Sequence, residues 1–586
     1  MKIIRSLMAS LAILLTASLA GAMEITRTDG WFETAIVQWK DVPGTKLYEV
    51  YIDGEGLDNV KADDELIRLY PAYWRVDIPG LKAGTYTVTV KALDGSGDTI
   101  DSATTESITV KPYIREGFAF RDAVPGAYNM DGTPKEDARV LYITPDNVNT
   151  VEMSTITSDK GKESTANGLS AILKNYNKGY DKRPLIIRFI GCIRNVDGLK
   201  GGNALEFTGA NFDKRATENV TLEGIGDDAT AYGFGFYTKR CRGIEIRNVG
   251  VMLFPDDGIS VENDNRNLWF HHCDFFYGMP GKDADQSKGD GTIDMKYNSS
   301  DITVDHNHFF DSGKCTFAGG ATEDGAIYFT YHHNWFDHAD SRCPRLCHAT
   351  THIYNNYFDA NATMCLLSTE NTSAFVEANY YRNCPSPMEI NMQGTNKKRW
   401  PDGTQDGGMN KGYNNLYEGS YELITQHDNP TDFDVYVVAY RDEQIPSTVA
   451  SLKGGNTYDN FDTAPDMYSY AADDPADVPS KVMAEAGRCD GGDFKWVFNH
   501  SSDDTNTSVD PDLKAALQNY DSSLVAIGGS SAANHTTAMF TPADETLPAS
   551  QQLYDLTGRS LTSTSDLPAG VYIVRSGDTT KKILVK

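Results

Sequence analysis

The chain has 586 residues, which is too long for one ordinary hydrophobic core and predicts two to four domains. Its formal net charge of -29 at pH 7 argues against a nucleic-acid partner, because phosphate binding requires a basic face. The composition is that of a globular protein, with 40% hydrophobic residues. If the substrate is itself a polyanion, such an acidic protein must supply local cations or a bound metal ion to offset the repulsion.

Residues 1–22 have the organisation of a secretory signal peptide. Lys2 and Arg5 precede an apolar run from Leu7 to Ala20, and the segment ends in small residues at Ala22. The run is short for a bilayer crossing, and no later stretch approaches the required length. We therefore expect an exported protein without a membrane span, secreted or at the cell surface, with the periplasm as the alternative.

Nine cysteines are scattered along the chain without a compact framework. The chain has no CxxC pair, and Cys343 with Cys347 lacks a second pair at metal-ligand spacing. This pattern predicts buried thiols, or one or two disulfides, rather than a disulfide scaffold.

Residues 24–111 alternate in short runs such as AIVQWK, LYEVYIDG and GTYTVTVKAL, separated by Gly, Pro and Asp turn signals. This alternation predicts a small antiparallel β-sandwich. The stretch LKAGTYTVTVKALDGSG resembles a fibronectin type III-like module, which implies a spacer or accessory role. Trp31, Tyr70 and Trp74 could bind a glycan, but aromatic residues in sandwiches more often belong to the core.

Residues 112–530 form a longer Gly- and Asn-rich region. Near its start, GLSAILKNYNKGY at Gly168 to Tyr180 predicts a helix just before the apolar run PLIIRFIGCI. We expect this helix to cap one end of a coil of short strands.

Five aromatic-rich segments repeat in this region: WFHHCDFF, VDHNHFF, YHHNWFD, IYNNYFD and VEANYYR. An interval of about 22 to 27 residues suits one rung of a parallel β-helix, where stacked amides form a ladder and stacked aromatic rings fill the interior. Leucine-rich repeats need a leucine lattice that is absent here, and propeller blades need about 40 residues. The shared ladder position and the aromatic residue two positions later are Cys273 and Phe275, Asn307 and Phe309, Asn334 and Phe336, Asn356 and Phe358, and Asn379 and Tyr381.

Paired histidines occur at equivalent positions of these repeats, at His271–His272 and His332–His333. Their equivalence favours a structural or cleft-lining role over zinc binding, and the HExxH motif is absent. The basic run NKKRW, residues 396–400, is interpreted as a solvated charge run, with part of a polyanion cleft as the alternative.

Residues 531–552 are expected to form a linker, and residues 553–586 contain further short strand patterns. The segments LYDLTGR, LPAGVYIVR and KKILVK resemble the end of the C-terminal sorting domain of type IX secretion substrates. A small β module without an address function is the alternative.

Several ordered motifs lie between residues 219 and 393: NVTLEGIG, RGIEIRNVGVM, NLWFHHCDFF, DGTIDMK with ITVDHNHF, YFTYHHNWF, RCPR and HIYNNYF. Together they resemble the pectate lyase family, polysaccharide lyase family 1, and residues 137–193 resemble it more loosely. The resemblance implies a right-handed parallel β-helix that cleaves polygalacturonate by β-elimination with Ca²⁺. The expected fold is therefore all-β, with an N-terminal antiparallel β-sandwich, a β-helix over residues 112–530 and a small C-terminal β module.

The resemblance also assigns site residues. It places the Brønsted base at Arg342, the first arginine of RCPR, and the substrate-binding lysine at Lys314 in DSGKC. It places the calcium-binding acids at Asp257 in PDDG and at Asp290 and Asp294 in DGTID. Such oxygen ligands suit Ca²⁺, and substrate carboxylates would complete the coordination.

Arginine is normally always protonated, so its use as a base requires a lowered pKa. At about pH 9.5, a group of pKa about 13 costs roughly 5 kcal/mol to deprotonate. Calcium and cationic neighbours would reduce this cost. We therefore expect an alkaline optimum, whereas an optimum near pH 5 would indicate a carboxylate acid and base.

Two features depart from the family pattern. Cys347 stands where the family often has a further arginine, and the adjacent His348 is a candidate substitute in substrate binding. The acids Asp256 and Asp257 are adjacent, whereas many members separate two acids by one residue, so Asp256 is a further candidate metal ligand. Arg345 is expected to bind a uronate carboxylate or to support the loop.

We therefore expect a secreted, monomeric, calcium-dependent pectate lyase that acts on de-esterified homogalacturonan without an organic cofactor. A pectin lyase on the same fold would not need the acids, and a polygalacturonase would need paired carboxylates acting with water. A non-catalytic β-helical glycan-binding protein is the alternative that Cys347 favours. The fourth calcium ligand stays open, with Asp283 and Asp285 as candidates.

Overall fold

The computed structural model describes residues 23–279, 287–320, 327–401, 403 and 405–530, and the backbone of four strands between residues 551 and 585. The expected signal peptide, most of the expected linker, and Asp283 and Asp285 lie outside these residues. Among the described residues, no helix combines the length and the apolar character that crossing a bilayer requires.

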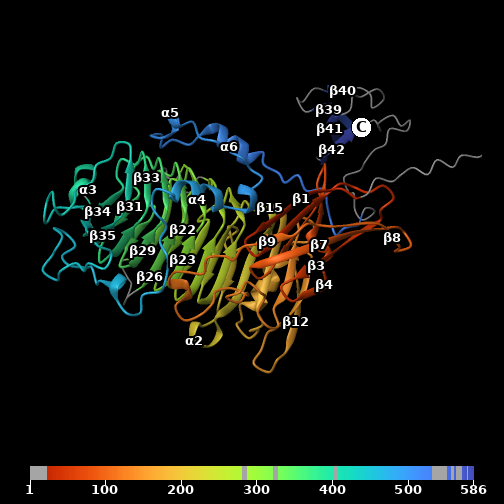
Figure 1. The fold of residues 1–586 in the computed structure, drawn as a ribbon, viewed down its shortest axis with the longest axis horizontal. Helices are drawn as coiled ribbons and strands as arrows, with labels where there is room; N and C mark the ends of the chain where they lie inside the picture. Colours follow the sequence, from red (N-terminus) through yellow and green to blue (C-terminus); the bar gives the residue numbers. More distant parts are fainter. Residues whose placement is uncertain are drawn as a thin grey trace, which may run out of the picture.

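Two antiparallel sheets form the N-terminal part of the molecule (Figure 1). Every second residue of β3 and β7 is buried, which is the alternation that the sequence predicted. Tyr70 and Trp74 are buried in this part of the molecule, as expected for core aromatic residues. The first sheet has the order β1 (Ile25–Trp31), β2 (Thr34–Trp39), β6 (Trp74–Pro79), β5 (Ile67–Leu69) and β38 (Ala526–Ile527), and the second has β4 (Leu57–Lys61), β3 (Leu47–Gly54), β7 (Gly84–Leu93) and β8 (Thr99–Thr104), with β9 (Ile108–Val110) also on β7.

Two long parallel sheets form the coil that follows, which confirms the predicted parallel β-helix (Figure 1). The strands of the longer sheet fall into two parallel series, since β17 pairs with β20 while β18 pairs with β21. That sheet consists of β10 (Arg139–Ile143), β13 (Leu185–Ile193), β15 (Thr217–Tyr232), β17 (Cys241–Arg247), β18 (Gly250–Met252), β20 (Arg266–His271), β21 (Asp274–Phe275), β23 (Ser300–Asp305), β24 (His308–Phe310), β26 (Tyr328–His332), β27 (Trp335–Asp337), β29 (Thr350–Tyr354), β30 (Tyr357–Asp359), β32 (Ser373–Glu377), β33 (Tyr380–Arg382), β35 (Met409–Tyr413), β36 (Leu416–Glu418) and β37 (Tyr436–Val437).

The second sheet of the coil has eight strands and carries the candidate site. Its order follows the sequence, so each strand belongs to the next rung of the coil. The strands are β14 (Ala204–Thr208), β16 (Gly235–Lys239), β19 (Ile259–Glu262), β22 (Gly291–Met295), β25 (Lys314–Gly319), β28 (Arg345–Cys347), β31 (Leu366–Ser368) and β34 (Met388–Ile390).

The repeated asparagines form the predicted amide ladder inside the coil. Each side-chain amide nitrogen donates to the next side-chain oxygen at 2.9 to 3.1 Å, and the ladder ends at Asn415, which the sequence comparison had not included. The aromatic residues two positions further on stack with ring centroids 4.5 to 5.2 Å apart, and Tyr417 extends this stack. The ladder satisfies buried polar groups, and each buried ring contributes about 2 to 3 kcal/mol.

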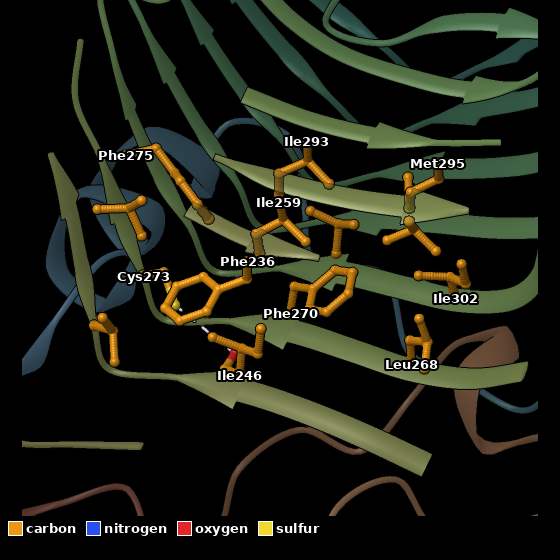
Figure 2. Close-up of a cluster of buried hydrophobic side chains, with 14 of the residues drawn as sticks. Phe236, Ile246, Ile259, Leu268, Phe270, Cys273, Phe275, Ile293, Met295 and Ile302 are labelled. Atoms are coloured by element: carbon orange, nitrogen blue, oxygen red, sulfur yellow. Dashed lines mark hydrogen bonds between the residues drawn. The ribbon is translucent and has the colours of Figure 1, made fainter. Parts of the chain in front are cut away.

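Side chains from both long sheets meet in the interior of the coil. Figure 2 shows residues of neighbouring rungs pointing toward one another. The thiol of Cys273 contacts the carbonyl of Ile246 at 3.7 Å. The labelled members of this core are Phe236, Ile246, Ile259, Leu268, Phe270, Cys273, Phe275, Ile293, Met295 and Ile302.

The predicted helix before PLIIRFIGCI is α1 (Leu169–Tyr176), and its apolar residues belong to the core of the coil. It is shorter than the predicted span because Gly179 has a φ of +70°, and its amide donates to the carbonyl of Tyr176 at 2.9 Å. The hairpin of β11 (Glu152–Ile156) and β12 (Glu163–Asn167) precedes it.

The segment after β37 runs back along the coil toward the sandwich (Figure 1). It ends in β38, which pairs antiparallel with β5 and so completes the first sheet of the sandwich. This segment contains α4 (Val478–Glu485), α5 (His500–Asp503) and α6 (Pro511–Gln518), while α2 (Phe212–Arg215) and α3 (Gly394–Arg399) lie in turns of the coil.

The sandwich packs directly on the first rungs of the coil. Ile190 and Ile225 of the coil belong to the same apolar cluster as the sandwich core. Arg68 donates to the carbonyl of Ile225 at 2.8 Å, and Arg75 pairs with Asp227 at 2.9 Å. Because these contacts are buried, the two parts form a continuous structure rather than a tethered pair.

All nine cysteines lie among the described residues, and all are buried free thiols. This outcome agrees with the first of the two predicted alternatives. Four strands near the C-terminus pair into an antiparallel sheet, with bounds β39 (Gln551–Asp555), β40 (Ser560–Leu561), β41 (Gly570–Ser576) and β42 (Thr579–Val585).

Candidate active site

The predicted site residues lie on successive rungs of the eight-stranded sheet. Lys314 begins β25, opposite Gly291 of β22 on one side and Ser341 on the other. The amide of Thr316 donates to the carbonyl of Arg342 at 2.7 Å, which fixes the turn before β28 to β25. The parallel register therefore brings residues from distant parts of the sequence to one face.

Three of the predicted acids converge at one end of this face. Carboxylate oxygens of Asp256, Asp257 and Asp290 all lie within 4.8 Å of one another. Burial, together with the negative charge of Asp294, raises the pKa of Asp257 to about 8. The pKa of Asp290 is also raised, first by burial and then by the charges of Asp294 and Asp256.

Asp294 lies beside this cluster but has a cationic partner of its own. Its Oδ2 is 2.9 Å from the ammonium group of Lys296, and the pKa of Lys296 is raised well above its usual value even though burial opposes this. The absence of a side chain at Gly291 makes room for Asp294, since a Cβ atom there would lie 2.3 Å from Asp294 Oδ1. The structure thus gathers three of the four predicted metal ligands and places the fourth against Lys296.

Lys296 is a charged residue of the site that the sequence analysis did not single out. A signal for it was present, because residues two apart in a strand face the same side of the sheet. Asp294 is partly buried on that side, and Lys296 follows at the spacing of two in DGTIDMK.

The chemistry of the acid cluster fits a calcium ion. The donor set consists of carboxylate oxygens, which hard divalent cations prefer. Burial and the charges of neighbouring acids raise the pKa values of Asp257 and Asp290, so the site disfavours their charged forms unless a positive charge compensates them. A bound divalent cation would supply this compensation.

The two arginines of RCPR lie near each other at the next rungs. Arg342 has a φ of +60°, an uncommon value for a non-glycine residue. Burial and the neighbouring charge of Arg342 lower the pKa of Arg345. Arg345 also hydrogen-bonds to Gln405, and its guanidinium lies 5.4 Å from the ring centroid of Phe317.

Phe317 separates the acids from the arginines on the outward face of the sheet. It pairs in register with Asp294 on one side and with Arg345 on the other. Its ring is partly exposed, so a bound polymer crossing this face would pass over acidic, aromatic and basic side chains in turn.

The first departure from the family pattern, Cys347 with the adjacent His348, lies at the end of β28. Cys347 is buried and pairs in register with Gly319. His348 is directed toward Glu370, with 3.7 Å between Nε2 and the carboxylate, and its Nδ1 is 3.3 Å from the side-chain amide of Asn371. His348 therefore lies between the side chains of Glu370 and Asn371.

The paired histidines form a buried stack, as the sequence indicated. The rings of His272, His306 and His333 stack with centroids 4.7 Å apart, and His272 also contacts Phe32 and Tyr113 of the N-terminal region. Within each pair, the two Nδ1 atoms are 2.9 Å apart. The ring nitrogens pair with each other within each histidine pair, and the rings of successive rungs stack face to face. This arrangement indicates a structural role.

The basic run 396–400 belongs to α3 and the residue after it. Arg399 pairs with the buried Glu389 at 2.9 Å and donates to Ser386 at 2.6 Å, while Lys398 pairs with Glu422. The charges of Lys398 and Arg399 are thus neutralised locally, so the run is paired rather than simply solvated.

Comparison with known proteins decides the family. The family model described as pectate lyase matches residues 174–487, which is more than half of the chain. The chain belongs to the pectate lyase family. This is a family of polysaccharide lyases, and the match includes every residue of the site described above.

Individual pectate lyase relatives are distant. A pectate trisaccharide-lyase from Bacillus licheniformis is 28% identical over 228 residues, and pectate lyase B from Dickeya chrysanthemi is 27% identical over 322 residues. These alignments cover 38% and 52% of this chain, and 62% and 77% of the respective relatives. The chain thus spans less than two thirds of the Bacillus protein.

Among solved structures, a pectate lyase from Bacillus sp. N165 in complex with trigalacturonate matches 64% of this chain and 99% of its own, with 19% identity and a TM-score of 0.44. Pectate lyase C from Erwinia chrysanthemi with Ca²⁺ matches 61% and 95%, with 19% identity and a TM-score of 0.40.

Proposed function

We propose that the protein is a calcium-dependent pectate lyase that cleaves de-esterified homogalacturonan by β-elimination. The observation that carries this proposal is the convergence of Asp256, Asp257 and Asp290 on the same face as Arg342 and Arg345. Clustered carboxylates can hold a divalent cation, and the arginines on this face can bind a uronate and take a proton from it.

Asp256, Asp257 and Asp290 would hold the calcium ion. When bound, the ion would neutralise these acids and a substrate carboxylate and would withdraw electrons from the uronate, which acidifies the proton at C5. Lys296 pairs with Asp294 and so limits the negative charge that a polyanionic substrate meets.

Arg342 would act as the base. In β-elimination it takes the C5 proton, the electron pair forms the C4–C5 double bond, and the glycosidic oxygen leaves from C4. Lys314, at the start of the adjacent strand, and Arg345 would bind substrate carboxylates. The outcome is one new reducing end and one unsaturated non-reducing end for each cleavage.

We also propose that the chain is exported, on the basis of residues 1–22, and that the fibronectin type III-like and type IX sorting-type resemblances describe its terminal modules. Reporter fusions would test export. A fusion of residues 1–22 should direct a passenger protein out of the cytoplasm, and replacement of Lys2 and Arg5 by Glu should reduce this.

The reaction is tested by the absorbance of unsaturated product from polygalacturonate, with added calcium and with a chelator. We expect product with calcium, little or none with chelator, and a rate that increases toward alkaline pH. Product that is insensitive to chelator would indicate a pectin lyase. Reducing ends without the absorbance would indicate a hydrolase, and neither signal would indicate a binding protein.

A further inference from the structure

A buried lysine links the three turns that carry the site. Lys288 is 5% exposed, and its ammonium group lies 2.5 Å from Asp311 Oδ1 and 2.7 Å from Asp340 Oδ1. Neither carboxylate belongs to the acid cluster, and neither has a role in the proposed reaction. These three residues are called the Lys288 cluster below.

Each member of the Lys288 cluster lies close in sequence to a proposed functional residue. Lys288 precedes Asp290 by two residues, and Asp340 precedes Arg342 by the same spacing. Asp311 lies in the turn that leads into Lys314. One ammonium group therefore joins a segment with a metal ligand, a segment with a substrate-binding lysine and a segment with the base.

Hydrogen bonds of the backbone connect the Lys288 cluster to the turn that contains Arg342 and to the start of β25. The amide of Asp340 donates to the carbonyl of Ser312 at 2.7 Å, and the hydroxyl of Ser341 donates to the carbonyl of Gly313 at 3.0 Å. The amides of Cys315 and Thr316 then donate to the carbonyls of Ser341 and Arg342. The turn containing Arg342 is thus fastened to the start of β25 immediately beside the Lys288 cluster.

The opposite side of the cluster is also fixed. The hydroxyl of the buried Tyr277 donates to Asp311, and it accepts the amide of Asp510 at 3.0 Å. Buried ion pairs contribute little net stability compared with apolar replacements, but their directional bonds can select one arrangement. A cluster of this kind is better suited to fixing the relative positions of turns than to strengthening the core.

We propose that Lys288, through Asp311 and Asp340, is a positioning residue that sets the distance between the metal-binding acids and Arg342. This proposal rests on the proposed function, because it assumes that both groups act on one substrate. A displacement of about 1 Å between groups that must act together can reduce the rate by about 100-fold.

The test compares Lys288→Met with Lys411→Met. Lys411 of β35 forms a buried pair with Asp462, at 2.6 Å, toward the last rungs of the coil, so its replacement also removes a buried ammonium group but away from the site. We expect kcat on polygalacturonate to fall about 10- to 100-fold in Lys288→Met, with KM changed less than about threefold, and to stay near wild type in Lys411→Met. Lys288→Arg should recover part of the loss.

Hydrogen exchange gives a second readout that does not depend on the reaction. The amides of Cys315 and Thr316 should lose protection in Lys288→Met while the asparagine ladder keeps it. Unchanged protection at these two amides would overturn the proposal, as would wild-type kcat in a folded variant. If the wild-type protein gives no unsaturated product, the proposed function fails, and the exchange result still decides whether Lys288 positions the turns.

Should Lys288→Met fail to fold, Asp340→Asn provides the same comparison with a smaller change. It keeps the size of the side chain and weakens only one of the two ion pairs. The same local loss of protection would support the proposal, and its absence would contradict it.

Discussion

At the scale of single residues, the site places acids beside acids and an arginine beside an arginine. Arg342 and Arg345 are close enough for the first to lower the pKa of the second, and Asp257 and Asp290 are held at raised pKa values beside Asp294. Burial and the proximity of like charges disfavour the charged forms in the free protein, and a bound cation or polyanion would favour them.

Arg342→Ala should reduce kcat by about 1,000-fold if this guanidinium is the base, since general-base catalysis contributes roughly 100- to 10,000-fold. Arg240→Ala is the matched control, because Arg240 has a similar φ of +54° and lies in a turn of an earlier rung. Equal initial rates for both variants in the absorbance assay would exclude Arg342 as the base. Similar melting temperatures would show that the loss is chemical.

His333 makes a separate prediction about pH and stability. Burial lowers the pKa of His333 to about 4, whereas an unfolded histidine titrates near pH 6.5. Above about pH 6.5 the ring is neutral in both the folded and the unfolded protein, so His333 makes its full contribution to the free energy of unfolding. Between about pH 6.5 and 4 only the unfolded chain gains the proton, so the free energy of unfolding falls by about 3 kcal/mol.

Denaturant unfolding at pH 7 and pH 4.5 would measure this effect. We expect His333→Asn to be less stable than wild type at pH 7 but to lose less stability on acidification. His427→Asn is the control, because His427 is exposed. An identical decrease in all three proteins would show that His333 does not contribute.

At the scale of elements, the amide ladder and the aromatic stack hold successive rungs in one register. Asn334 accepts bonds from Asn307 and donates to Asn356 and to the carbonyl of Val304 at 2.9 and 2.8 Å. Each rung therefore positions the next, and this repeated contact sets the spacing between the rungs that carry the site residues.

Asn334→Ala should lower the free energy of unfolding by roughly 2 to 5 kcal/mol, because it leaves several buried polar groups without partners. Asn456→Ala removes an exposed asparagine and should cost less than about 0.5 kcal/mol. Denaturant midpoints would compare the two. A small effect at Asn334 would mean that water replaces the missing amide.

At the scale of the whole molecule, the sandwich is part of the packed structure. Arg75 is buried and pairs with Asp77, Asp227 and Asp490, so it connects the sandwich, the coil and the returning segment. The fibronectin-like resemblance suggested a spacer or accessory module, but a spacer would not share a core with the coil.

Arg75→Ala should therefore destabilise the protein by about 3 to 5 kcal/mol, as expected when a buried charge network loses one partner. Calorimetry of the wild type should give one main transition for sandwich and coil together. Lys61→Ala is the control, since Lys61 pairs with Asp64 at the surface and should cost less than about 1 kcal/mol. Two well-separated wild-type transitions would contradict the shared core.

Local repetition explains how much could be predicted from sequence. Asn307, Asn334 and Asn356 recur at regular intervals beside aromatic residues, so the rungs were visible in the chain itself. Asn415 was missed because 36 residues separate it from Asn379, which interrupts the period. The motifs also located the acids and arginines that the fold brings to one face.

Contacts between distant segments could not be predicted in this way. The ion pair between Lys288 and Asp340 spans 52 residues and has no local signal. The pairing of β38 with β5 involves only two residues of β38.

The pairing of β38 with β5 also determines the order in which the protein can be completed. During synthesis the other four strands of the first sheet, β1, β2, β5 and β6, emerge early, but the edge strand that completes this sheet follows the entire coil. Until then, the edge of β5 that later receives β38 is open to other strands, which is a hazard for aggregation. Successful folding of the coil therefore protects the N-terminal sheet, and a fragment that ends before residue 526 should be more prone to self-association than the full chain.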